Sequence, residues 1–195
     1  MLDYELLIQA GAVIRHFKKG DTILQEGTHA RFYFQIVEGE VKMVNTGENG
    51  QAFIQGIFKP GNSFAEPPLF LDAPYPASAI AITDCNVIVL EKAALLSLLS
   101  GNFSQQMQLL KSLSERIYFK SMMAKEISLY DAGHRILTLI DFLKERDGYT
   151  DELYPVTLTR QQIADLTGLR VETVIRAINY LFDKELVRKG RKIYR

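Results

Sequence analysis

The chain has 195 residues, of which 47% are hydrophobic and 24% are charged, and its formal net charge is zero. This composition is typical of a globular protein, and the length allows one large domain or two small ones. No run of about 18 apolar residues occurs, which excludes a membrane span. Asp3 and Glu5 stand where a signal peptide carries basic residues, so we expect a cytoplasmic protein.

The zero net charge hides a basic C-terminal end. Residues 160–195 contain nine Lys and Arg against four Asp and Glu, and five of the nine lie in the last eight residues, RKGRKIYR. A basic end on a neutral protein indicates contact with a polyanion, although a solvated tail has the same composition.

The N-terminal half is predicted to be rich in short strands. Residues 1–10 have the pattern of a short helix, and from Ala12 to Leu90 short β-rich runs such as FYFQIVEG and CNVIVL alternate with glycine-containing turns. Runs of this length and spacing predict an antiparallel barrel or sandwich.

A long helix is predicted after the strands. Lys92–Ser100 has the pattern of a short helix, and Phe103–Leu129 then runs without Gly or Pro, which gives a helix about 40 Å long at 1.5 Å per residue. One side of it carries residues at heptad spacing: Leu110, Leu113, Ile117, Lys120, Ala124 and Ile127. This seam predicts a parallel homodimer, and the alternative is a helix lying on its own domain.

A further helix is predicted at residues 131–147, with Asp131 as its N-cap. Its apolar face consists of Ile136, Leu139, Ile140 and Leu143. The Leu129-Tyr130-Asp131 joint between the two long helices is a natural hinge.

The segment TRQQIADLTGLRVETVIRAINYLFDKELV predicts a helix-turn-helix. Thr159 to Gln162 forms a capping-box pattern that starts a short helix, and Gly168 supplies a tight turn. The second helix, 171–184, is expected to bury Val174, Ala177, Ile178, Leu181 and Phe182. Glu172, Thr173 and Arg176 then point outward.

Such a second helix enters the DNA major groove by its first turns. Arg176 is able to bind guanine O6 and N7, and Glu172 is able to accept from cytosine N4. The two side chains are four residues apart, so they also fit an ordinary ion pair on a surface helix.

The pattern R-Q-x-I-A-x-x-x-G-x-x-x-E-T-V-x-R from Arg160 to Arg176 resembles the helix-turn-helix signature of the CRP/FNR family of bacterial transcription regulators. FKKGDTILQEGTHARFYFQIVEGEVKM resembles the opening of that family's cyclic-nucleotide-binding-type β-roll, and KPGNSFAEPPLF resembles its phosphate-binding cassette. The resemblance implies an α+β protein: a double-stranded β-helix or jelly-roll domain at 1–100, a dimerisation helix at 101–129 and a winged helix-turn-helix at 130–195.

The family resemblance also implies partners. These are double-stranded DNA with a pseudo-palindromic site, RNA polymerase and a second copy of the chain. The expected DNA-binding residues lie on the helix-turn-helix and on a basic wing: Thr159, Arg160, Gln161, Arg170, Glu172, Thr173, Arg176, Lys189, Arg191 and Lys192.

The cassette departs from the cAMP-binding pattern. Family members that bind cAMP have a Gly-Glu pair and then Arg-Ser-Ala, whereas this chain has Phe64-Ala65-Glu66 and Ala77-Ser78-Ala79. Without the Arg, a phosphate loses a charge-assisted bond of roughly 1.5 to 3 kcal/mol. We therefore expect no tight cAMP binding, and a pocket that is vestigial or altered for an unknown small-molecule effector.

No cofactor is expected. Cys85 is the only cysteine, which excludes the iron-sulfur cluster of oxygen-sensing members, and it fits a small buried side chain. His16, His29 and His134 are haem ligands by residue type only, because no second ligand follows at a useful spacing. No metal site is predicted.

The sequence also bears on two other classes of protein, enzymes and ligand-binding modules that do not bind DNA. An enzyme is not expected, because the chain has no phosphate-binding loop, H-E-x-x-H or paired CxxC, and Gly61-Asn-Ser-Phe-Ala65 only approaches G-x-S-x-G. The alternative function is a cyclic-nucleotide-like ligand-binding regulatory module that does not bind DNA, against which the basic C-terminus argues.

Overall fold

The computed structural model describes residues 2–47, 52–151, 153–189 and 193–195. The chain divides into two compact units, Met1–Glu115 and Arg116–Arg195. None of the helices in the described ranges is long and apolar enough to cross a membrane.

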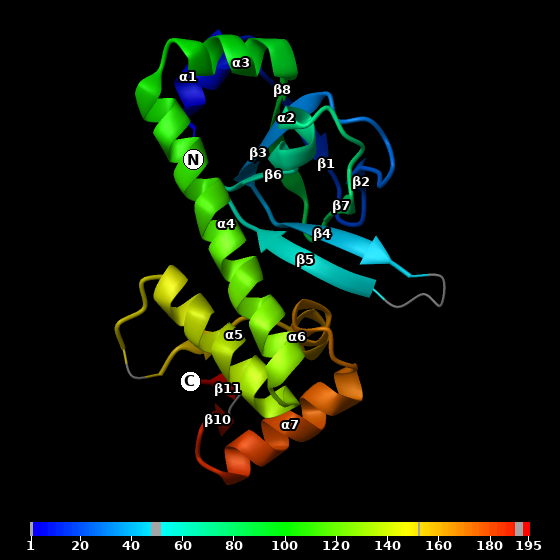
Figure 1. The fold of residues 1–195 in the computed structure, drawn as a ribbon, viewed down its shortest axis with the longest axis vertical. Coiled ribbons are helices and arrows are strands. Elements are labelled where there is room, and N and C mark those ends of the chain that lie inside the picture. The colour runs from blue at the N-terminus through cyan, green and yellow to red at the C-terminus, as the bar shows by residue number, and fades with distance from the viewer. Residues whose placement is uncertain (1, 48–51, 152, 190–192) are drawn as a thin grey trace. The chain divides into compact units, whose positions relative to one another are not determined.

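The N-terminal unit contains eight short strands among its described residues. They are β1 (Val13–Phe17), β2 (Thr22–Leu24), β3 (Phe32–Glu38), β4 (Val41–Thr46), β5 (Ala52–Phe58), β6 (Ser63–Phe64), β7 (Ser78–Ala81) and β8 (Cys85–Glu91). All pairings between them are antiparallel, in two four-stranded sheets of order β1-β8-β3-β6 and β2-β7-β4-β5. These sheets confirm the predicted antiparallel domain and the α+β class (Figure 1).

The core of this unit lies between the inward-facing sides of the strands. Tyr33, Ile36, Val41, Val87 and Ile88 are all at most 1% exposed. Strand β3 shifts register against β8 between Ile36 and Glu38. Burial of these side chains supplies the main force that holds the two sheets together.

Among its described residues, four helices begin in the N-terminal unit: α1 (Tyr4–Gln9), α2 (Glu66–Phe70), α3 (Lys92–Ser100) and α4 (Phe103–Leu129). Asp3 caps α1 by accepting a hydrogen bond from the Leu6 amide. The helices predicted at 1–10, Lys92–Ser100 and Phe103–Leu129 are confirmed. Helix α2 contacts β3 beside the strand pair β3–β6 (Figure 1).

The described part of the C-terminal unit contains the end of α4, three further helices and a three-stranded sheet. These elements are α5 (Ala132–Arg146), β9 (Pro155–Val156), α6 (Arg160–Thr167), α7 (Val171–Asp183), β10 (Arg188–Lys189) and β11 (Ile193–Tyr194). The strands are antiparallel in the order β10-β11-β9. Helix α5 packs against both α6 and α7.

Helix α5 is confirmed, and the joint predicted to act as a hinge lies between the end of α4 and the start of α5. Helix α4 ends at Leu129, and the Asp131 carboxylate caps α5 by accepting from the His134 amide at 2.9 Å. The four residues of the predicted apolar face of α5 are all buried: Ile136, Leu139, Ile140 and Leu143. The joint is held by side chains as well, because Glu126, 5% exposed, pairs with His134 Nε2 at 3.1 Å and accepts from Thr138 Oγ1 at 3.2 Å.

Candidate nucleic-acid interface and effector site

Helix α6 begins with a complete capping box. The Thr159 amide donates to Gln162 Oε1 at 2.8 Å, and the Gln162 amide donates to Thr159 Oγ1 at 3.1 Å. The two bonds satisfy donors that a helix start otherwise leaves unpaired. Arg160 and Gln161 follow at once on the first turn, so both lie at the N-terminal end of the helix, where anions are favoured.

The Gln161 side chain is held from within α6. Its Nε2 donates to Asp165 Oδ1 at 2.7 Å, while Gln161 is exposed and Asp165 is only 7% exposed. The amide group of Gln161 therefore has its nitrogen turned toward Asp165, which leaves its carbonyl oxygen available to a partner.

The turn between α6 and α7 has the geometry that the glycine predicts. Gly168 has φ 67° and ψ 24°, in the left-handed region, and its amide donates to Ala164 O. The hydroxyl of the fully buried Thr167 donates a hydrogen bond to Ile163 O at 2.6 Å. Helix α6 extends through Thr167.

Helix α7 buries one side and exposes the predicted reading residues. Val174, Ile178 and Leu181 are at most 2% exposed, whereas Glu172 and Arg176 are exposed. Ala177 and Thr173 are half-buried. The prediction that Phe182 is buried is wrong: it is 43% exposed, although the adjacent Leu181 is only 2% exposed, so the buried side of α7 is narrower than predicted.

The first turn of α7 is open to a partner. Arg170 is the N-cap residue, and its side chain makes no capping bond. Within the described part of the chain, no ion pair joins Glu172 to Arg176. Both charged groups therefore face solvent on the helix end that also presents its unpaired backbone N–H groups.

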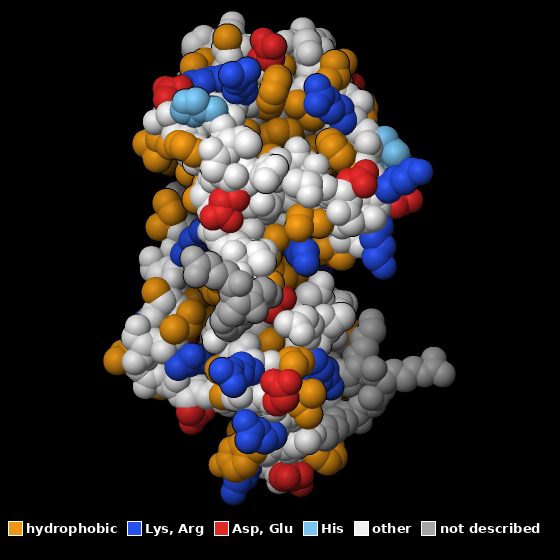
Figure 2. Space-filling model, turned by 90° about the vertical axis from the view of Figure 1, so that its right-hand side faces the viewer, with side chains coloured by type: hydrophobic (Ala, Val, Ile, Leu, Met, Phe, Trp, Pro, Cys, Tyr) orange, Lys and Arg blue, Asp and Glu red, His pale blue; other side chains and the backbone are white. Residues whose placement is uncertain are grey.

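The predicted wing is present as a strand pair. Arg188 and Lys189 on β10 pair with Tyr194 and Ile193 on β11. The predicted DNA contacts Arg191 and Lys192, and the side chain of Lys189, lie outside the described residues. On the face drawn in Figure 2, Lys and Arg side chains are interspersed with hydrophobic ones over the C-terminal unit.

The effector cassette is tightly packed around Phe64. The ring of Phe64 is fully buried and stacks on Phe34 with centroids 5.2 Å apart, and Phe58 lies 6.0 Å away. Ala65 has φ 62° and ψ 24°, a left-handed conformation that costs a non-glycine residue about 1 kcal/mol or more. Glu66 is fully buried and has an interaction partner within the protein.

The segment that follows α2 is built into the sheet. Ala77 and Ala79 are fully buried, and Ala79 pairs with both Leu24 and Met43. Ser78 Oγ accepts from the Glu26 amide at 3.0 Å. Because residue 77 is a buried alanine, this position provides no positively charged side chain.

Two side-chain hydrogen bonds connect β4 and β5 to the same segment. Asn45 Nδ2 donates to Pro76 O at 2.6 Å, and Gln55 Nε2 donates to Asn45 Oδ1 at 2.7 Å. The carbonyl before Ala77 is thus already engaged by the protein.

Helix α4 leaves much of its predicted seam exposed. Leu110 is 55% exposed, Ile117 65% and Ile127 37%, and Lys120 and Ala124 are exposed as well. Leu113 differs, because it packs against the core of the N-terminal unit. Phe103 and Met107 extend the same exposed stripe toward the helix start.

The three histidines lie at the surface and the cysteine is buried. His16, His29 and His134 are all exposed, and the described residues contain no group of three or more His, Cys, Asp or Glu side chains that could hold a metal ion. The predicted burial of Cys85 is confirmed, since it is 1% exposed and its thiol donates to the carbonyls of Thr83 and Glu40.

Two family models match the sequence: a cyclic nucleotide-binding domain at residues 14–102 and a Crp-like helix-turn-helix domain at residues 134–195. The CRP-like cAMP-activated global transcriptional regulator of Mycobacterium tuberculosis is 27% identical over 165 residues, which cover 83% of this chain and 74% of that protein. The cAMP-activated global transcriptional regulator CRP of Salmonella typhimurium is 25% identical over 177 residues, 89% of this chain and 84% of that protein.

Solved structures share the fold across nearly the whole chain. The c-di-GMP-responsive global regulator CLP of Xanthomonas campestris gives a TM-score of 0.77 at 18% identity and covers 98% of both chains. FixK2 of Bradyrhizobium japonicum gives a TM-score of 0.75 at 21% identity over 93% of this chain and 91% of that one.

Proposed function

We propose that this chain recognises a specific pseudo-palindromic DNA site as a homodimer. The proposal starts from the membership of the chain in the CRP/FNR family of DNA-binding transcription regulators. Proteins of this family are regulators and not enzymes. The observation that carries the proposal is the exposed first part of α7, where Glu172 and Arg176 face outward over a buried apolar side.

The chemistry of α7 supports base reading. Arg176 matches the two acceptors on a guanine edge, and Glu172 matches the amino group of a cytosine. Arg160 and Thr173 lie on the leading turns of α6 and α7, where they are suited to phosphate oxygens, and Gln161 beside Arg160 offers its carbonyl oxygen to a donor on the DNA. We infer that Arg170, whose side chain makes no capping bond, adds a phosphate or base contact.

Selection of bound sites from random duplex DNA, with and without cell extract, tests the function. We expect one enriched pseudo-palindromic sequence from the purified protein or from the protein plus extract. Dependence of the enrichment on extract identifies effector control. Absence of any enriched sequence under both conditions contradicts the proposal.

We further propose that the regulator does not respond to cAMP, although both relatives above are cAMP-activated. Ala77 supplies no positive charge, and the left-handed conformation at position 65 is occupied by alanine. Loss of the charge-assisted bond alone weakens a phosphate ligand about tenfold to a hundredfold. Calorimetric titration with cAMP, with a cAMP-activated relative as positive control, checks this, and a micromolar or tighter dissociation constant contradicts it.

The remaining parts of the proposal follow from the family. We propose an effector-modulated activator or dual regulator that contacts RNA polymerase and works in the cytoplasm, where bacterial DNA lies. The alternative, a ligand-binding module that does not bind DNA, predicts no retention on a heparin or non-specific DNA column. The DNA-binding proposal predicts retention that falls steeply with salt, because bound cations release counterions from DNA.

A further inference from the structure

The N-terminal segment Leu2–Asp3 lies between two elements of the N-terminal unit, strand β3 and helix α4. Leu2 is 2% exposed and belongs to the core of this unit. Its backbone makes two hydrogen bonds with one side chain of β3: the Leu2 amide donates to Gln35 Oε1 at 3.1 Å, and Gln35 Nε2 donates to Leu2 O at 3.1 Å. The amide group of Gln35 therefore holds the N–H and the C=O of one residue, as a paired strand does.

The next residue along the chain is bonded to α4. The Asp3 amide donates to Gln105 Oε1 at 2.8 Å, and Gln105, on the first turn of α4, is only 7% exposed. Leu109 and Leu113 follow Gln105 at intervals of four residues. Leu109 lies in the core of the same unit and Leu113 packs against it, so the three side chains share the inner side of α4. Two consecutive backbone residues thus link β3 to the start of α4.

Gln35 also lies next to the cassette. It pairs with Ser63 of β6, and the residue before it, Phe34, pairs with Phe64 of β6 and stacks on its ring. Strand β6 leads directly into Ala65 and α2. A displacement of β6 therefore acts on β3 at the residue whose side chain holds the N-terminal segment.

The two glutamines are polar side chains in a core that is otherwise mainly apolar. Gln35 is 2% exposed, and its Oε1 accepts a second hydrogen bond, from the Tyr33 hydroxyl at 2.6 Å. A buried amide that loses its partners keeps its desolvation cost, so each glutamine favours the one arrangement in which its bonds are made. Such a network specifies the position of α4 against β3 more narrowly than apolar contacts do.

We propose that Leu2–Asp3 is a clip that couples the cassette to α4. A change at β6 is passed through Gln35 to the clip, and through Gln105 to the first turn of α4. The outer side of this part of α4 carries Phe103 and Met107, 74% and 46% exposed, which extend the exposed stripe of the helix. The clip thus links the state of the cassette to the position of that stripe. The inference goes beyond the proposed function and does not require DNA binding.

The first test is a double-mutant cycle in the full-length protein, measured by urea denaturation. Gln35→Met and Gln105→Met conserve side-chain size and remove the hydrogen bonds to the clip. If the clip couples its two ends, the second substitution costs less once the first has released the segment. We expect the unfolding constant of the double variant to differ about fivefold or more from the product of the single effects, whereas independent sites agree within about twofold. Agreement at that level overturns the proposal.

Amide hydrogen exchange tests whether the coupling reaches the cassette, and it needs only Gln105→Met, so it stands even if Gln35→Met fails to fold. The reporters are the Ile36 amide, which donates to Asn62 O at 2.9 Å, and the Gly61 amide, which donates to Ile36 O at 2.8 Å. We expect Gln105→Met to raise exchange at both amides about fivefold or more, although it lies on α4. Exchange that rises only along α4 and α1 contradicts the proposal, because the role of Gln105 is then local.

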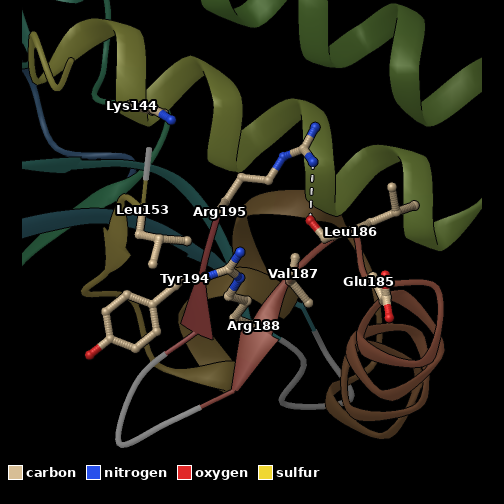
Figure 3. Close-up of a pocket in the computed structure, with 8 residues that line it drawn as sticks. All are labelled: Lys144, Leu153, Glu185, Leu186, Val187, Arg188, Tyr194 and Arg195. Atoms are coloured by element: carbon tan, nitrogen blue, oxygen red, sulfur yellow. Dashed lines mark hydrogen bonds between the residues drawn. The ribbon is translucent and has the colours of Figure 1, made fainter. Parts of the chain in front are cut away.

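Two control variants separate the clip from the loss of a glutamine or of hydrogen bonds in general. Gln108→Met makes the same change at an exposed position of α4. Arg195→Met acts in the C-terminal unit, where it removes bonds to Asp141 at 2.9 and 3.1 Å and to Leu186 O at 3.0 Å (Figure 3). Both controls are expected to leave exchange at the two reporter amides unchanged. A rise in either control as large as that in Gln105→Met overturns the proposal.

Discussion

At the scale of single residues, the sequence was most informative where a side chain bonds to its own backbone neighbourhood. Thr159, Asp131 and Gly168 act as predicted, because caps and tight turns depend on a few adjacent atoms. Left-handed Ala65 and Glu185 could not be predicted, since neither residue type favours positive φ. Their conformation is set by surrounding structure that a local pattern does not contain.

Gly39 is a residue whose identity the fold requires. A Cβ at this position would lie 2.3 Å from Asp84 O and 2.6 Å from Cys85 Sγ, and its φ is +89°. We expect Gly39→Ala to lower the free energy of unfolding by about 3 kcal/mol or more, from overpacking plus backbone strain. Urea denaturation measures the loss.

Gly20→Ala is the matched control for Gly39→Ala. Gly20 has φ +93° but nothing within 4 Å of an added Cβ, so only the backbone strain of about 1 kcal/mol remains. Equal losses in the two variants would mean that the close approach of Asp84 and Cys85 carries no cost.

At the scale of elements, periodicity predicted the helices well and their surroundings less well. The 27 residues of α4 and the buried face of α5 follow from spacing alone. Leu113 and Phe182 show the limit. The same heptad places Leu113 toward its own unit while Leu110 stays exposed, because periodicity gives a face and not the partner that covers it.

The exposed stripe of α4 predicts a dimer that depends on Leu110 and Ile117. Burying both in a partner seam stabilises association, so Leu110→Asp with Ile117→Asp places charges in an apolar interface and is expected to give monomers by light scattering. Leu113 is left unchanged because it packs in its own unit. As a control, Gln108→Asp adds one negative charge at another exposed position of the helix and keeps the dimer. A double variant that remains dimeric shows that the interface lies elsewhere.

Tyr154 connects β9 to the end of α5. It is 4% exposed, and its hydroxyl donates to Asp147 Oδ2 at 2.8 Å. Burial first, and then the hydrogen bond and charge of Asp147, raise the pKa of Tyr154 above its ordinary value. We expect Tyr154→Phe to cost about 1.5 kcal/mol of unfolding free energy at neutral pH, as for other hydrogen bonds to charged groups.

The sign of the pH dependence follows from that raised pKa. Above about pH 10 the unfolded tyrosine loses its proton while the folded one keeps it. The wild-type protein therefore loses more stability than the Phe variant as pH rises through this range. Urea denaturation at neutral pH and above pH 10 checks this, and a gap between the two proteins that stays constant contradicts it.

At the scale of the whole molecule, the architecture and the helix-turn-helix could be predicted because both are encoded locally: turns, strand lengths, one long helix and one capping box. The packing around the cassette at residues 64–66 could not. It depends on how the rings of Phe34, Phe58 and Phe64 pack together, and on a hydrogen bond between Asn45 and Pro76, which are far apart in sequence.

Arg176→Ala tests the proposed DNA-bound dimer, because a two-fold dimer would present Arg176 to both half-sites of a pseudo-palindromic site at once. Each lost guanine contact costs about 1 to 3 kcal/mol, so a symmetric site should lose about twice that. Affinity is measured on the selected duplex and on single-base variants at several salt concentrations. We expect the Arg176→Ala variant to bind the selected duplex and the duplex with the contacted guanine replaced with equal affinity. The salt dependence of its binding should change little, because the lost contact is to a base and not to a phosphate.

As control, Arg160→Ala removes a predicted phosphate contact, so it should weaken binding to all duplexes alike and flatten the dependence of affinity on salt. If Arg176→Ala instead weakens every duplex equally, α7 does not read the base and the assignment of this helix is wrong.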